Sequence, residues 1–311
     1  MRAHKTLRVA AYALVGLAFA YIGRALWAYR DWLLDWQASS TDLMLIFVSI
    51  LVYGLSGLLL SSSWCKLNQL CGQGEFCRRQ CIAIYGTTQI AKYVPGNVFH
   101  FVGRHAAGVR AGLPHAVLAC SASLEMVALL FSAGVLALSG ILIPESGLLG
   151  LLPFPLWSVI GIVVAGFIVM VFLTPYALRR FKLVPVVEGK KTQIQMLLPI
   201  VLRHLMFFML SGLLMAVLMY AVVGSMRWST LILAMSSYPI SWLAGYVIPG
   251  ASAGIGVREA AIMLMLSTAV LPQEATLIAI LMRVVTLLGD LFFYLLAKSV
   301  ESSLNKRSEA A

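Results

Sequence analysis

Long apolar runs separated by short polar segments make up most of the chain. Residues 43–60, 156–173 and 205–223 carry no charged side chain, and each run is close to the ~20 residues that a helix needs to cross a ~30 Å hydrocarbon core. Residues 7–27, 116–143 and 275–300 form similar runs with a few ionisable groups. The pattern predicts about six transmembrane helices. A cleaved signal peptide is the alternative for the first run, but the run is long, so a retained helix is expected.

Two other apolar stretches are interrupted by a Pro-Gly pair. These are YVPGNVFHFVGR, with Pro95 and Gly96, and YVIPGASAGIGVRE, with Pro249 and Gly250. The pieces on either side are short for a membrane span, and non-helical backbone at membrane depth requires burial in protein or a wet cavity. Each Pro-Gly therefore predicts the tip of a re-entrant helical hairpin, because proline ends a helix and glycine permits a tight reversal.

The basic residues between the runs predict the orientation of the chain, since cytoplasmic loops collect Lys and Arg. Six spans and two hairpins put both termini and the basic segments around Arg78 and Arg179 in the cytoplasm. The two hairpins then enter from opposite faces. Eight full spans are the alternative, but that topology would move the segment around Arg179 to the other side.

The two halves of the chain share a pattern of prolines and charges. The matching pairs are Arg104 nine residues after Pro95, Arg258 nine after Pro249, Glu125 eleven after Pro114 and Arg283 eleven after Pro272. With the hairpins opposed, this pattern predicts an inverted repeat. We expect one all-α membrane domain over residues 1–311, with repeats at 1–147 and 148–311.

Composition supports the same class and excludes others. Hydrophobic residues make up 61% of the chain and charged residues only 11%, which does not suit a soluble domain with a wet surface. The net charge of +11 is explained by cytoplasmic loops that face anionic lipid, so no nucleic-acid partner is expected. Walker, Rossmann and nucleophile-elbow motifs do not occur. The sequence therefore predicts neither an enzyme nor a cofactor.

Charged residues within the apolar segments are the candidate functional groups. A rise of 1.5 Å per residue places Glu125 and Arg283 about 15 Å into their spans, which predicts a buried pair between the repeats. The pair would control passage along a central pathway or hold the halves together. Arg104 and Arg258 are expected to bind lipid phosphate near opposite faces, or only to cap the hairpin helices. Glu259 would tune Arg258 or keep it solvated.

The cysteines and Asp290 raise two further questions, whether the chain holds a metal and whether it relays protons. Cys65, Cys71, Cys77 and Cys81 crowd one segment, but their spacing is not the paired C-x2-C of a zinc site, so reduced thiols are expected and no metal is predicted. Asp290 in the last apolar run leaves a proton relay as an alternative.

The segments KYVPGNVFHFVGR with AGLPHAVLACSASLE, and PGASAGIGVREAAIMLML with LPQEATLIAILMR, resemble the signature regions of the flippase-like family, the lysylphosphatidylglycerol synthase transmembrane region. Ala251 departs from the pattern, because a second glycine is common there. The resemblance implies the membrane part without the aminoacyl-transferase domain. It implies a bacterial inner-membrane protein that transports or flips an anionic lipid or a lipid-linked glycan. The alternative is a non-transporting scaffold for a glycosyltransferase or a lipid-modifying enzyme.

Overall fold

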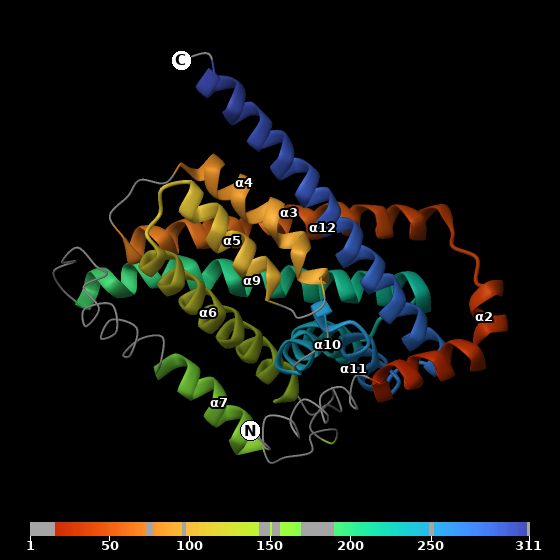
Figure 1. Cartoon of the computed structure of the whole chain (residues 1–311). Coiled ribbons are helices and arrows are strands. Elements are labelled where there is room, and N and C mark those ends of the chain that lie inside the picture. Colours follow the sequence, from red (N-terminus) through yellow and green to blue (C-terminus); the bar gives the residue numbers. More distant parts are fainter. Residues whose placement is uncertain are drawn as a thin grey trace.

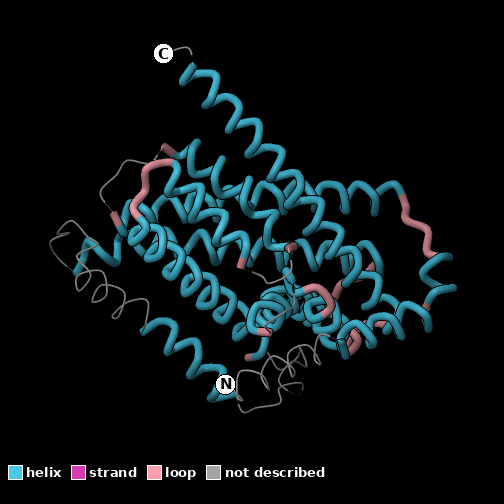
Figure 2. The backbone as a smooth tube through the Cα atoms, in the orientation of Figure 1, coloured by secondary structure: helices cyan, strands magenta, loops and turns pink. Residues whose placement is uncertain are grey.

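The described part of the computed structural model consists of helices joined by loops and turns (Figures 1 and 2), and it comprises residues 16–72, 77–94, 98–142, 150, 156–168, 190–248 and 252–309. Residues 16–28 form a first helix. The elements that follow are α2 (Arg30–Asp35), α3 (Ser40–Cys71), α4 (Arg78–Gln89), η1 (Ile90–Tyr93), α5 (Phe99–Arg110), α6 (His115–Ile141), α7 (Leu156–Ile168), α9 (Lys190–Val223), α10 (Trp228–Val247), η5 (Ser252–Gly254), α11 (Val257–Leu266) and α12 (Pro272–Glu309).

Four of these helices are long and apolar enough to cross a membrane. They are α3, α6, the part of α9 from Leu197 to Val223, and the part of α12 from Pro272 to Lys306. The chain is therefore an all-α, multi-pass membrane protein. The other two predicted spans are described only in part, as the helix at residues 16–28 and as α7, so the number six remains a prediction.

The long helices pack closely where their residues are small. A Cβ atom on Gly54 of α3 would stand 2.7 Å from the carbonyl oxygen of Gly289 in α12, so these two helices touch backbone to backbone. Small residues permit such close approach between membrane helices, where dispersion contacts provide much of the attraction. α3 also packs along α9, and α12 crosses the bundle before its last turns extend past the other helices (Figure 1).

The two segments with Pro-Gly are broken in the structure as well. In the first, α4 and η1 lead to α5, which packs against α4; in the second, α10 leads through η5 to α11, which packs against α10. The 3-10 turns η1 and η5 contact each other, and η1 also contacts α12. The predicted tip residues Pro95, Gly96, Pro249 and Gly250 lie outside the described residues. The two breaks thus meet beside α12.

Candidate functional site

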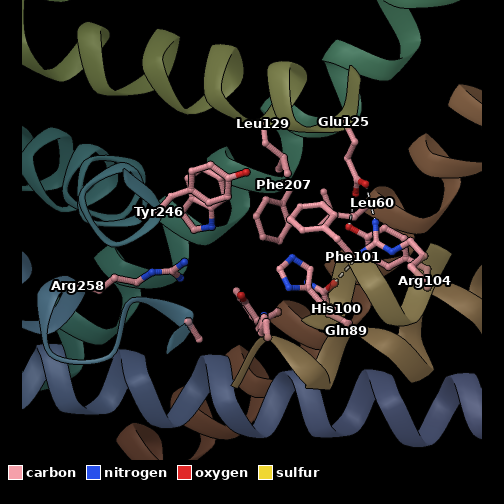
Figure 3. Close-up of a pocket in the computed structure, with 15 residues that line it drawn as sticks. Leu60, Gln89, His100, Phe101, Arg104, Glu125, Leu129, Phe207, Tyr246 and Arg258 are labelled. Carbon is pink, nitrogen blue, oxygen red and sulfur yellow. Dashed lines mark hydrogen bonds and ion pairs between the residues drawn. The ribbon is translucent and has the colours of Figure 1, made fainter. Parts of the chain in front are cut away.

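A polar cavity of about 60 Å³ lies where the two broken segments meet (Figure 3). Its walls come from α3, α4, η1, α5, α6, α9, α10, η5 and α11, so both halves of the chain contribute. The charged or ionisable side chains that line it are Tyr53, Tyr85, Lys92, His100, Arg104, Glu125, Tyr246 and Arg258. Arg104 and Arg258 lie on opposite sides of the cavity (Figure 3).

Arg104 of α5 is buried and both of its Nη atoms have partners, whereas its Nε has no hydrogen-bond partner among the described residues. Its Nη1 lies 2.6 Å from Oε2 of Glu125 in α6, and the two side chains are only 4% and 1% exposed. Its Nη2 donates to Oε1 of Gln89 at 3.0 Å, and the guanidinium carbon lies 3.6 Å from the centre of the Tyr85 ring, within the range of a cation–π contact. The Tyr85 hydroxyl donates to the other Glu125 oxygen at 2.7 Å. Arg104 therefore ties α4, α5 and α6 together.

The predicted ion pair between Glu125 and Arg283 is wrong. Glu125 pairs with Arg104 instead, and Arg283 of α12 pairs with Glu259 of α11, with 3.4 Å between Nη1 and Oε1. Depth along a helix was a poor guide here, because it does not say which way a side chain faces. In both of these pairs, the charged residue of the long helix meets the short helix that precedes it in the chain.

Glu259 also fixes the start of α11. Its Oε2 accepts a hydrogen bond from the backbone N–H of Gly256 at 2.7 Å, which satisfies a donor at the helix N-terminus. Arg283 Nη1 donates to the carbonyl oxygen of Ala253 at 3.3 Å. The backbone there has positive φ values at Ala253 (50°), Gly254 (71°) and Gly256 (86°). Glu259 and Arg283 together brace this left-handed turn.

Among the lysine and arginine residues that line the cavity, Arg258 is the one without an acidic partner in the described part of the chain. Its side chain passes Gly245 and Gly254, where a Cβ atom would stand 2.7 Å from Cγ and 2.5 Å from Nε respectively. Its guanidinium carbon is 5.8 Å from the centre of the Trp242 ring. The buried Nε has no hydrogen-bond partner, and no ion pair involving Arg258 occurs in the described part of the chain. Two glycines thus make room for an arginine that points into the cavity (Figure 3).

Lys92, Tyr93 and Asp290 form a contact that the spacing of the sequence did not predict. Lys92 Nζ and the Tyr93 hydroxyl both lie 2.6 Å from Oδ2 of Asp290 in α12. The Arg283 guanidinium carbon lies 5.5 Å from the centre of the Tyr93 ring. The sequence feature that pointed to such a contact is the carboxylate of Asp290 within an apolar run, since a charged residue there needs a partner. Lys92 gave no comparable signal, because it lies beside the break at Pro95.

His100 is a second cavity residue that sequence spacing did not select. It is buried, its Nδ1 has no hydrogen-bond partner among the described residues, and its ring contacts the Phe101 ring in a tilted arrangement with 4.0 Å between centres. Within the described residues, His, Cys, Asp and Glu do not gather in a group of three that could hold a metal ion. The cysteines approach one another in pairs instead, with 2.7 Å between the Sγ atoms of Cys71 and Cys120.

The fold and the site together define a multi-pass membrane protein with a charged cavity between its helices. In comparisons with known proteins, neither a family model nor a curated protein matched the chain.

Proposed function

We propose that this protein binds an anionic lipid, or a lipid-linked glycan intermediate, and moves it across the membrane, with Arg258 as the group that binds the phosphate. The observation that carries the proposal is a charge balance. Arg104, Lys92 and Arg283 are each paired with an acid, namely Glu125, Asp290 and Glu259. Arg258 faces the cavity and has no acidic partner among the residues that the structure describes.

An unpaired cation among apolar helices is unfavourable, because the protein does not replace the water that the charge has lost. An anionic group in the cavity would supply the missing partner. Arginine suits phosphate better than lysine does, since its planar guanidinium donates two parallel hydrogen bonds. The proposal therefore narrows the predicted pair of phosphate-binding arginines to one, with Arg104 in a positioning role.

The topology belongs to the same proposal. Six spans with two opposed re-entrant hairpins would put the contact between η1 and η5 at membrane depth, where irregular backbone is tolerated only inside protein or beside a cavity. The inverted repeat gains support from the two ion pairs, because each one joins the second short helix of a broken segment to the long helix that follows. Rocking of one repeat against the other would expose the cavity to each face in turn. The resemblance to the flippase-like family points the same way.

The alternative is a non-transporting subunit that holds a glycosyltransferase or a lipid-modifying enzyme. The engagement of Arg104 and of Glu259 favours it, since both residues brace local structure. A scaffold, however, gives no reason for a glycine-lined slot that directs an unpaired arginine into a cavity.

Lipid mass spectrometry on gently extracted protein tests the proposal. The comparison includes wild type, Arg258→Ala, Arg258→Lys and, as the matched control, Arg110→Ala at the exposed end of α5. We expect one anionic lipid to be enriched over the bulk membrane in wild type and in the control, reduced in Arg258→Lys and absent from Arg258→Ala. Labelled lipid of the enriched class should then move across proteoliposomes that contain wild type but not those with Arg258→Ala. Lipid of bulk composition in all four proteins would overturn the proposal and favour the scaffold.

A further inference from the structure

A second hollow, larger than the cavity, lies on the outside of α5 and α6. It has a volume of about 570 Å³ and is lined by three helices, α3, α5 and α6. Trp64 and Leu118 are buried at its floor, whereas Val102 and Ala106 of α5 are exposed at its side. The volume falls within the range of small-molecule sites, about 300–1,000 Å³. We call this hollow the α5–α6 groove.

The groove is apolar along most of its length and polar at one end. Apart from Arg104, which is turned toward Glu125, its polar lining residues are His105 and His115, whose ring nitrogens Nε2 and Nδ1 lie 2.9 Å apart. His115 is the first residue of α6, and α5 ends nearby at Arg110. An apolar trough with a polar, basic end matches the form of a lipid, whose hydrocarbon chain is joined to an anionic headgroup.

The surroundings of the groove are those of a surface that faces lipid. Val102 at the side of the groove is 59% exposed, and Val98 and Phe99, at the start of α5, are 53% and 45% exposed. Exposed apolar side chains favour hydrocarbon over water. Its neighbours α3 and α6 are two of the four helices suited to cross the membrane. The hydrocarbon of the bilayer is thus the medium that meets this side of the molecule.

The groove and the polar cavity share a wall. Phe101 and Arg104 line both of them. Phe101 is half-buried, and its ring contacts the His100 ring at a tilt. Rotation about two side-chain bonds, χ1 and χ2, can move the Phe101 ring. A headgroup at the groove would therefore have Phe101 and Arg104 between it and the unpaired Arg258.

We propose that the α5–α6 groove holds one hydrocarbon chain of a lipid and is the lateral entrance to the cavity, with Phe101 as the gate. The inference rests on the proposed function. It adds where the lipid tail lies and which side chain the headgroup must pass.

The test uses phosphatidylglycerol with a diazirine in one acyl chain, mixed into phosphatidylcholine vesicles that contain the full chain. Illumination should label peptides of α5 and α6. Val102→Trp and Ala106→Trp fill the groove and should lower this labelling several-fold. Leu213→Trp, at a position on α9 that is 45% exposed and outside the groove, is the matched control and should label like wild type. Phe101→Ala should extend the labelling to peptides of α10 and α11, which line the cavity but not the groove.

The outcomes separate this inference from the proposed function. Labelling that misses α5 and α6, or that is unchanged in both tryptophan variants, would overturn the groove as a lipid site while lipid enrichment through Arg258 still stands. Cross-linking of two chains through a cysteine in Val102→Cys would overturn it also, because a second copy would then cover the groove. Absence of any enriched anionic lipid in wild type would refute the proposed function itself. Thermal unfolding of each variant, compared with wild type, identifies a variant that misfolds. If one tryptophan variant misfolds, the labelling of the other one decides whether the groove is a lipid site.

Discussion

Arg104 and Glu125 form a buried ion pair with 2.6 Å between Nη1 and Oε2, and the rings of Tyr85, Trp64 and Phe101 surround the guanidinium. The second half of the chain has the same arrangement with the charges exchanged. There the acid, Glu259, is on the short helix and the arginine, Arg283, is on the long one. Two ion pairs of opposite polarity thus fasten the two broken segments. Arg258 lies nine residues after a proline, as Arg104 does, but it has no acidic partner among the described residues.

Breaking the first ion pair should destabilise the protein. Glu125→Leu leaves Arg104 as an uncompensated buried charge, a change that costs about 3–5 kcal/mol. The midpoint of thermal unfolding in detergent, followed by tryptophan fluorescence, should fall clearly below that of wild type. The double variant Arg104→Met with Glu125→Leu should recover much of the loss, because no unpaired charge remains. A midpoint unchanged in Glu125→Leu would contradict the burial of this pair.

Gly254 and Gly224 provide a matched test of the space that Gly245 and Gly254 leave for the Arg258 side chain. Both have positive φ, at 71° and 75°, so alanine at either position strains the backbone by about 1–2 kcal/mol. A Cβ on Gly254 would also meet Arg258, whereas one on Gly224 meets nothing within 4 Å. We therefore expect Gly254→Ala to lose the enriched anionic lipid and Gly224→Ala to keep it. Equal lipid enrichment in both variants would mean that the direction of Arg258 does not matter.

Asp290 should be energetically coupled to Lys92. The two groups are 2.6 Å apart, and their side chains are 8% and 16% exposed. In a double-mutant cycle with Asp290→Asn and Lys92→Met, we expect a coupling of about 0.5–3 kcal/mol. Unfolding measurements on the two single variants and on the double variant give this value. If the effects of the two single variants on the free energy of unfolding simply add in the double variant, the contact does not hold η1 to α12.

The Sγ atoms of Cys71 and Cys120 should form a disulfide under mild oxidation. They lie 2.7 Å apart, at the end of α3 and in α6. Diamide would take up the two hydrogen atoms that the thiols lose, and intact-protein mass spectrometry followed by peptide mapping would locate the bond. Cys120→Ser is the control and should leave Cys71 without this partner. Failure of the bond to form in wild type would place α3 and α6 further apart than described here.

Cys77 is a native reporter of orientation. Of the five cysteines it is the exposed one, and it lies beside the basic residues Arg78 and Arg79. The predicted six-span topology puts it on the cytoplasmic side. A membrane-impermeant maleimide should therefore label it in inverted membrane vesicles but not in intact spheroplasts. Cys77→Ser removes the signal and serves as the control. Labelling of Cys77 in intact spheroplasts would show that the predicted orientation of the chain is reversed.

The sequence by itself determined the class of protein and the points where the helices break. Apolar runs of spanning length require burial in hydrocarbon or protein wherever they lie, so the four long helices could be predicted from composition along the chain. The ends of η1 at Tyr93 and of α10 at Val247, each two residues before a proline, followed from local chemistry, because proline restricts the backbone beside it. The spacing also selected Arg104, Glu125, Arg258, Glu259 and Arg283 as a set of charges within apolar segments, although it predicted the wrong partners.

Tertiary structure decided which charges meet. The rise of a helix gives the depth of Glu125 and of Arg283, but the direction of each side chain depends on how the helices rotate and pack against their neighbours. Packing turned Glu125 toward α5 and Arg283 toward α11, and it brought Lys92 to Asp290 across 198 positions of the chain. The absence of a partner for Arg258 among the described residues is a property of the whole arrangement. It depends on packing, because the described acids Glu125, Glu259 and Asp290 are each paired with another cation.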